Sequence, residues 1–234
     1  MYLSEKFIGN SKILIDWVRA MTKLYVSTLG FEEKFTIRGL LRASLNPGDF
    51  IHVFLAEPLE DKAKNALEIV KKFVEEYLGF IELRYTVLPV IEYSKAIGKA
   101  VKVFKMYNNV DLVILNLSGG MRALILEVLA ASLITLNPAR TTIEIELESL
   151  KGYIRAPLTL LTHIPPTSEE EELLRKISEG NTTLESLAKG LNQPKSTIHR
   201  RVRKLIDKGL LSEEHYGRKT YYKLTDLGRI YIYV

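Results

Sequence analysis

Two glycine-containing segments carry residue types suited to binding an anion. Residues 28–34 read Thr-Leu-Gly-Phe-Glu-Glu-Lys, and residues 116–122 read Asn-Leu-Ser-Gly-Gly-Met-Arg. Glycines leave backbone N–H groups accessible, and the guanidinium of Arg122 can pair with phosphate oxygens in a planar fork. Each segment is expected to precede a helix, whose amino end favours negative charge. These residues therefore predict a phosphate-bearing ligand.

Neither segment has the spacing of the common nucleotide-binding loops. Both lack the G-x-G-x-x-G pattern of dinucleotide sites and the G-x-x-x-x-G-K-[ST] pattern of P-loops, which disfavours ordinary NAD binding and NTP hydrolysis. Taken alone, Ser-Gly-Gly is better explained as a bare tight turn.

A second set of chemically suited residues is the basic charge near the end of the chain. The whole sequence has 33 Lys and Arg against 28 Asp and Glu, a net charge of +5. From Lys189 onward there are eleven basic and four acidic residues, so this segment alone carries +7. Four cations fall among residues 200–204, which indicates an electrostatic footprint for nucleic-acid phosphates. A solvated helix face is the alternative.

The basic residues fall on one face of a predicted helix over 195–207. Ile198, Val202 and Leu205 form its apolar stripe at i, i+4 and i+7, while Arg200 lies roughly 200° around the helix from Ile198. A short helix at 184–191 and a turn at 192–194 precede it. This arrangement lets the second helix enter a major groove.

Two short strands, 210–213 and 220–224, are expected around a basic tip at 216–219, followed by a helix capped by Thr225. Residues 170–234 thus resemble the winged helix-turn-helix of archaeal and bacterial transcription regulators, above all in the stretch LAKGLNQPKSTIHRRVRKLIDKGLL. The alternative is a helical bundle with a solvated basic face. The resemblance implies base contacts by Ser196, Thr197, His199 and Arg200. It implies phosphate contacts by Lys195, Arg203, Lys204, Arg218 and Lys219.

The elements that position the glycine segments alternate in type along the first part of the chain. The expected strands are 24–29, 50–56, 81–88, 110–117 and 142–147, and the expected helices are 36–45, 61–78, 94–107 and 121–136. This order predicts an α/β fold, a Rossmann-like and mainly parallel sheet. The apolar run at 110–117 indicates a central strand, and 153–161 is a possible edge strand.

Paired prolines at 165–166 mark the expected domain boundary, because they continue neither a helix nor a sheet interior. We expect a first domain over 1–163, a linker over 164–168 and a small winged helix-turn-helix domain over 169–234. Thr167 or Ser168 would cap the first helix of that domain. Residues 1–22 are either packed or an extension before a start at Met21, and the sequence leaves both readings open.

The helix over 121–136 is apolar nearly all round, so burial of one side cannot satisfy it. Either other helices of the chain or another subunit must cover the second side. In a small open α/β sheet we favour the subunit, which predicts a homodimer.

Taken together, a Rossmann-like domain with TLGF after its first strand and NLSGGMR after its fourth, followed by a winged helix, resembles the archaeal CRISPR-associated Rossmann-fold (CARF) transcriptional regulators over about residues 22–234. The resemblance implies a cyclic oligoadenylate, expected to be cyclic tetra-adenylate, bound across the two-fold axis of a homodimer. The residues implied at that site are Thr28, Leu29, Gly30, Phe31, Ser118, Gly119, Gly120, Met121 and Arg122. Asn116 and Ser118 stand where the family often has an acidic residue and a threonine, which leaves ring size and affinity open.

The expected function is a ligand-responsive, double-stranded-DNA-binding regulator of CRISPR-associated genes, without catalytic residues, metal or cofactor. The resemblance also implies a rival, a nuclease that cleaves its own cyclic ligand with Arg122 and Ser118. A third option is a partner-binding scaffold whose basic helix touches RNA. No cysteine occurs, which excludes disulfides, cysteine zinc sites and a thiol nucleophile and favours a reducing compartment. Without an export signal or an apolar stretch of ~18 residues, we expect a cytoplasmic protein and no membrane partner.

Overall fold

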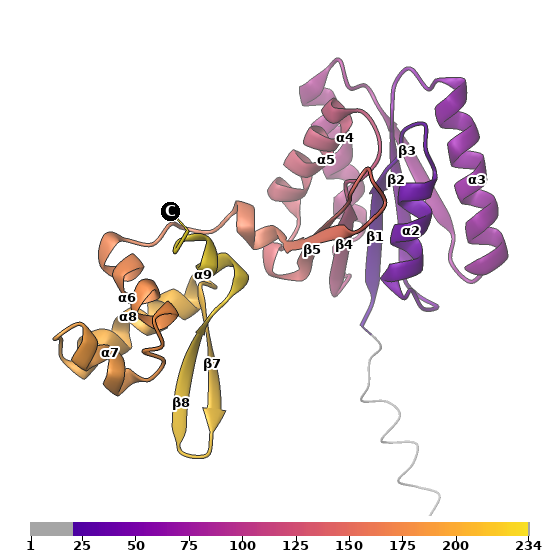
Figure 1. Cartoon of the computed structure of the whole chain (residues 1–234). Helices are drawn as coiled ribbons and strands as arrows, with labels where there is room; N and C mark the ends of the chain where they lie inside the picture. Colours follow the sequence, from indigo (N-terminus) through magenta and orange to yellow (C-terminus); the bar gives the residue numbers. More distant parts are fainter. Residues whose placement is uncertain (1–20, 234) are drawn as a thin grey trace, which may run out of the picture. The chain divides into compact units, whose positions relative to one another are not determined.

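The computed structural model describes residues 21–233, so the expectation for residues 1–22 lies almost wholly outside the described residues. The chain divides into two compact units between Leu158 and Thr159 (Figure 1). The second unit thus begins before the proline pair. Leu160 packs against its core, and His163 hydrogen bonds to the Tyr231 hydroxyl.

The first unit alternates strands and helices as the sequence predicts. Its strands are β1 (Lys23–Thr28), β2 (Phe50–Ala56), β3 (Leu83–Leu88), β4 (Leu112–Asn116), β5 (Thr141–Glu146) and β6 (Tyr153–Pro157). Its helices are α2 (Lys34–Ala43), α3 (Asp61–Tyr77), α4 (Tyr93–Met106) and α5 (Arg122–Thr135), with a 3-10 turn η1 (Pro138–Arg140). A second 3-10 turn, η2 (Leu158–Leu161), spans the division between the two units. The predicted mainly parallel α/β fold is confirmed.

The six strands form one sheet in the order β3-β2-β1-β4-β5-β6. The first five strands run parallel, and β6 pairs with β5 antiparallel. Strand β4 is central, as its apolar run indicates. The expected edge strand over 153–161 is a strand only to Pro157, after which the chain turns into η2.

Each face of the sheet is covered by two helices, α2 and α3 on one side and α4 and α5 on the other (Figure 1). One core packs β1, β2 and β4 side chains, such as Leu24, Phe54 and Leu115, against Phe104 and Leu124 of α4 and α5. The other core packs the opposite face against α2 and α3. Burial on both faces explains why the strands are nearly continuous in apolar residues.

His52 of β2 is a buried titratable group in the first of these cores. Its Nδ1 lies 3.0 Å from the Tyr107 hydroxyl and its Nε2 lies 3.0 Å from the Thr86 hydroxyl. Burial, aided by the charge of Arg84, lowers the pKa of His52 from 6.5 to about 4. The folded imidazole therefore stays neutral at pH values at which the unfolded chain binds a proton.

We expect acid to destabilise the first unit through His52. The unfolded chain binds this proton below about pH 6.5 and the folded chain only near pH 4, so stability is lost as the pH falls through that window. Full loss would be about 3 kcal/mol and the loss at pH 5 about 2 kcal/mol. Urea unfolding of the wild type and His52→Asn at pH 7 and pH 5 measures this contribution. Equal pH dependence in the two proteins would contradict the assignment to His52.

The second unit contains three packed helices, a hairpin and a short final helix. These are α6 (Ser168–Ser178), α7 (Leu184–Gly190), α8 (Lys195–Asp207), β7 (Leu211–Tyr216), β8 (Lys219–Leu224) and a final short helix α9 (Asp226–Ile230). Thr167 caps α6 in a reciprocal pair with Glu170, and Thr225 caps α9. Ile198, Val202 and Leu205 are buried against Leu174 and other residues of the core, as the predicted apolar stripe requires.

The hairpin of β7 and β8, here called the wing, is longer than predicted. The sequence indicated strands at 210–213 and 220–224 around a four-residue tip, whereas β7 continues to Tyr216 and only Gly217 and Arg218 form the turn. Gly217 has φ +62, a conformation that a two-residue hairpin turn requires. Tyr216 and Lys219 are therefore a cross-strand pair rather than turn residues.

Among residues 21–233, no helix combines the length and the apolar character needed to cross a bilayer.

Candidate functional site

The two glycine segments lie side by side because their strands are neighbours. Strands β1 and β4 pair in parallel, with Ser27 opposite Asn116. The segments that follow these two strands therefore leave the sheet at the same end. The sheet order reverses here, since β2 and β3 lie beyond β1 and β5 lies beyond β4. Such a switch point is where open α/β sheets bind ligands.

The loops after β1 and β4 contact each other backbone to backbone. The Thr28 hydroxyl donates a 2.6 Å hydrogen bond to the Gly119 carbonyl oxygen. A Cβ on Gly30 would lie 2.8 Å from the Gly120 Cα, and one on Gly119 would lie 2.9 Å from the Thr28 carbonyl oxygen. Gly120 has φ +94, which favours glycine. No larger residue fits this close approach.

The predicted ligand residues divide into buried and accessible groups. Thr28, Leu29 and Gly119 are buried, and Leu29 packs in the core beneath α2. These three can offer a ligand only backbone groups. The side chains of Phe31, Met121 and Arg122 are exposed, and Gly30, Ser118 and Gly120 are half-buried.

Asn116 anchors the loop after β4 through two hydrogen bonds. Its amide nitrogen donates 2.9 Å to the Tyr25 hydroxyl, and its oxygen accepts 3.0 Å from the Ser118 backbone N–H. The Ser118 hydroxyl in turn accepts 2.8 Å from the Glu146 backbone N–H. Burial raises the pKa of Tyr25, so its phenol remains a proton donor to the Thr36 carbonyl oxygen. Asn116 and Ser118 therefore shape the loop from within.

A buried ionic cluster beside these loops escaped the sequence analysis. Arg42 of α2 lies 2.5 Å from a Glu144 oxygen and 2.6 Å from a Glu146 oxygen, and both carboxylates are almost fully buried. Arg38 reaches Glu146 and Arg155 reaches Glu144, each at 2.8 Å. The pattern of β5, in which Thr and Glu alternate with Ile, does not indicate this cluster, because the arginines that pair with its glutamates come from α2 and β6. The cluster joins α2, which follows the loop after β1, to β5. Strand β5 supports the loop after β4 through the Glu146 backbone N–H, which donates to the Ser118 hydroxyl.

The second candidate site is built on α7 and α8. Thr183 caps α7, and the turn before α8 places Asn192 at φ +49. Arg201 points inward, where its guanidinium donates 2.7 Å to Gln193 and 2.5 Å to Glu169. With Arg201 and the buried apolar stripe on its inner side, α8 presents its exposed residues to a partner.

The predicted DNA-contacting residues of α8 form two stripes. Ser196, Arg200 and Lys204 are exposed at i, i+4 and i+8, and Thr197 is half-buried. A second exposed stripe, also at i, i+4 and i+8, faces the wing; it consists of Lys195, His199 and Arg203. His199 thus lies on a different stripe from Arg200. Arg218 and Lys219 are exposed at the wing turn.

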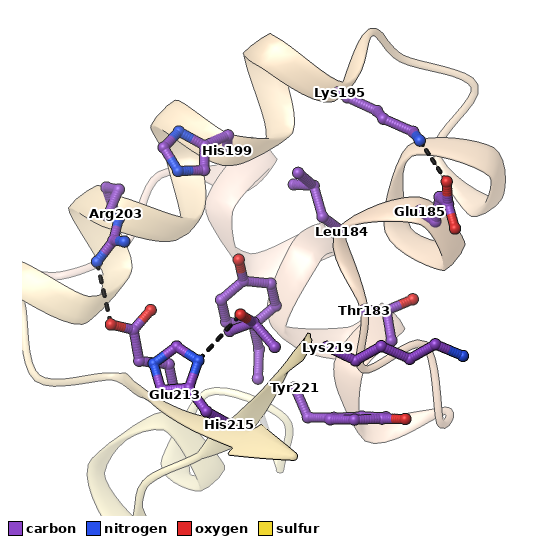
Figure 2. A pocket seen from close by; sticks show the side chains of 12 residues that line it. Thr183, Leu184, Glu185, Lys195, His199, Arg203, Glu213, His215, Lys219 and Tyr221 are labelled. Atoms are coloured by element: carbon purple, nitrogen blue, oxygen red, sulfur yellow. Dashed lines mark hydrogen bonds and ion pairs between the residues drawn. The ribbon is translucent and has the colours of Figure 1, made fainter. Parts of the chain in front are cut away.

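Between the second stripe and the wing lies a hollow of about 460 Å³, here called the α8–wing groove. Figure 2 shows side chains of α8, of the start of α7 and of both wing strands around it. It contains the cations Lys195, Arg203 and Lys219 and the carboxylates Glu185 and Glu213. The residues of such a groove suit a polyanion that lies along α8. Within residues 21–233, no three His, Asp or Glu side chains gather in a way that could hold a metal ion.

Comparison with known families decides the relationship of the first unit. The model of the Csa3 CRISPR-associated Rossmann-like domain matches residues 23–157, more than half of the chain. The chain belongs to this family. A winged helix-turn-helix DNA-binding model matches residues 172–212 of the same chain. The predicted order, a CRISPR-associated Rossmann-like domain before a winged helix, is confirmed.

Other comparisons are more distant. No curated protein matches this chain. It is similar to the PcaV transcriptional regulator from Streptomyces coelicolor in complex with its natural ligand, at 25% identity over 32% of this chain and 57% of that one, with a TM-score of 0.27. It is also similar to protein VC1899 from Vibrio cholerae, at 10% identity over 89% of this chain and 64% of that one, with a TM-score of 0.39. This chain spans less than two thirds of either protein.

Proposed function

We propose that this chain is a CRISPR-associated transcription regulator that binds double-stranded DNA through its winged helix and a cyclic oligoadenylate through its Rossmann-like domain. One observation carries the proposal. The chain combines glycine loops packed together at the sheet's switch point with an exposed cationic helix of the helix-turn-helix type. The first suits a small phosphorylated ligand and the second suits a duplex.

The ligand side of the proposal uses the groups that the two loops leave accessible. Arg122 at the start of α5 supplies a guanidinium for a phosphate, and Gly30 and Gly120 are only half-buried, so part of their backbone stays accessible to one. The exposed ring of Phe31 and the exposed side chain of Met121 offer apolar contacts for nucleobases. Cyclic tetra-adenylate, a ring with two-fold symmetry, would join the loops of two subunits.

A homodimer is part of this proposal and is supported by α5. Leu126, Leu133 and Ile134 of this helix are exposed, with 64%, 36% and 67% of their surfaces accessible. Apolar surface of this kind on one helix favours contact with a second subunit. A dimer would also present two α8 helices to the two half-sites of an operator, spaced about 34 Å apart.

Calorimetric titration tests the whole proposal. Cyclic tetra-adenylate would be titrated into the full chain alone and into its complex with a duplex selected from a random library for tight binding. Saturable binding at one ring per two chains, with an affinity that differs between the two titrations, is the expected result. The selected duplex would also be compared with duplex RNA of equal length.

Three outcomes would contradict the proposal. If the ring does not bind, the cyclic oligoadenylate is not the ligand of this chain. Conversion of the ring to linear products during the titration would favour the nuclease. Tighter binding of duplex RNA than of DNA would favour an RNA-binding scaffold.

Arg200 and Lys219 are expected to contribute to DNA binding in different ways. Arg200 lies on the exposed stripe that does not line the α8–wing groove, and Lys219 lies at the wing turn. Arg200→Ala should cost about 1–3 kcal/mol on the selected duplex and little on random DNA. Lys219→Ala should weaken both duplexes alike and reduce the salt slope by about 0.9. Fluorescence anisotropy at several salt concentrations measures both effects, and equal losses on both duplexes for Arg200→Ala would make it a phosphate contact.

A further inference from the structure

Two cations of the α8–wing groove are already bound to carboxylates of the chain itself. The Lys195 ammonium donates a 2.5 Å hydrogen bond to Glu185, and the Arg203 guanidinium donates a 3.2 Å hydrogen bond to Glu213 (Figure 2). Neither carboxylate belongs to α8, since Glu185 lies in the first turn of α7 and Glu213 lies in β7. The pairs therefore bridge α8 to the elements on either side of the groove.

The paired cations remain accessible to a larger anion. More than half of the Lys195 and Arg203 side-chain surface is exposed, 58% and 52%. Glu185 is more exposed still, at 78%. Hydrogen bonding by Lys195, and more weakly the charge of Lys219, lowers the pKa of the Glu185 carboxyl, so this carboxylate is ionised near neutral pH. Both carboxylates line the α8–wing groove together with the cations that they pair with.

Glu213 is held more firmly than Glu185. Only 27% of its side chain is exposed, and its second carboxylate oxygen is buried without a hydrogen-bond donor among the described residues. Strand pairing with Tyr222 fixes its backbone. Glu213 therefore cannot move far when its cation is taken by another anion, and it would lie near that anion as an unpaired negative charge.

We propose that Glu185 and Glu213 compete with the DNA backbone for Lys195 and Arg203, so that a phosphate binds either of these two cations in place of a carboxylate. This inference rests on the proposed DNA-binding function. Each replacement exchanges one charge-assisted hydrogen bond for another, so the two cations add little net affinity. The competition acts on the backbone contact and not on the bases. It lowers affinity for all DNA alike and leaves discrimination to the outward stripe that contains Arg200.

The test removes each negative charge and keeps its shape. Glu185→Gln and Glu213→Gln would be measured with random-sequence duplex DNA by fluorescence anisotropy between 50 and 200 mM salt. Each substitution is expected to tighten binding about two- to fivefold at 50 mM salt and to steepen the salt slope by up to about 0.9. The ratio of affinities for the selected and random duplexes should stay unchanged.

A matched control comes from the same unit. Glu179→Gln removes the carboxylate that pairs with Lys176 at 2.8 Å in α6, and neither residue lines the groove. It should leave DNA affinity unchanged. Lys195→Gln should weaken binding more in the Glu185→Gln background than in the wild type, because only there does Lys195 act on the phosphate without competition.

The results separate the inference from the function on which it rests. A wild type that binds no duplex even at 50 mM salt would overturn the proposed function. Wild-type binding with unchanged or weaker affinity in Glu185→Gln would overturn the competition, since a weaker variant would mean that the carboxylate positions the cation for DNA. Glu185 is exposed, so its variant remains informative even if Glu213→Gln fails to fold.

Discussion

Gly30→Ala is expected to abolish binding of cyclic tetra-adenylate while leaving the sheet intact. The added Cβ would lie 2.8 Å from the Gly120 Cα and 2.9 Å from the Gly120 nitrogen. Both are backbone atoms, so no rotamer change can relieve the clash. The loops after β1 and β4 must separate, and the groups proposed to hold one ligand then no longer face it together.

The size of this effect follows from the geometry. Overpacking of this kind costs about 1–3 kcal/mol of folding stability, which the cores on the two sheet faces can absorb. Ligand affinity should fall by about a hundredfold or more, because misplacement of about 1 Å removes charge-assisted hydrogen bonds that the pair of loops makes jointly. Calorimetry with cyclic tetra-adenylate and urea unfolding would separate the loss of binding from the loss of stability.

Gly98→Ala is the matched control for this experiment. Gly98 lies within α4, and a Cβ there would meet nothing within 4 Å. Alanine should therefore keep ligand binding and stabilise the helix by about 0.5–1 kcal/mol. Wild-type ligand affinity in Gly30→Ala would show that the loops do not form the ligand site.

Much of the fold could be predicted because its signals are local. The apolar runs that became β1, β2 and β4, and the apolar spacing of α8, are fixed by burial of nearby side chains and survive in the sequence as periodicity. The two glycine loops could also be placed together, at the carboxyl ends of the strands, because the sheet was predicted to be parallel. Parallel strands bring their carboxyl ends together whatever the intervening sequence.

Features that depend on partners distant in sequence could not be predicted. The sequence places Thr28 at the predicted ligand site but does not indicate that its hydroxyl donates to the Gly119 carbonyl oxygen, 91 residues away. Arg42 finds Glu144 and Glu146 across a similar distance. The angular positions of residues around α8 predicted which of them are exposed. They did not predict which of these face the wing, because the wing follows α8 in the sequence and its position against the helix depends on tertiary packing. The wing's length was hidden by polar residues at 213–215, which give no alternating pattern.

The double variant Leu126→Asp/Ile134→Asp is expected to convert the proposed dimer into folded monomers. Both side chains are mostly exposed in the single chain, so charge at these positions costs little in the monomer. In a dimer whose interface covers α5, the same two positions would place four unpaired carboxylates in an apolar contact, which is strongly unfavourable. Sedimentation velocity at micromolar concentration and circular dichroism would show loss of the dimer and retention of the fold.

Loss of the dimer should have large effects on both proposed sites. A monomer must bind the second half-site as a separate event, so affinity for the selected duplex should fall by about 10²- to 10⁴-fold. Cyclic tetra-adenylate should lose half of its contacts, because a symmetric ring would then meet one pair of loops instead of two. Affinity for a duplex with a single half-site should be unchanged, since α8 and the wing belong to the other unit.

Leu41→Asp provides the control for surface charge itself. Leu41 lies in α2 and is 67% exposed, the same exposure as Ile134, but α2 covers the opposite face of the sheet from α5. This variant should remain a dimer with wild-type DNA affinity. Dissociation by Leu41→Asp but not by the α5 variant would place the subunit contact on the other face. The two-fold ligand site would then have to be built around α2 and the loop that precedes it, with Arg122 no longer near the axis.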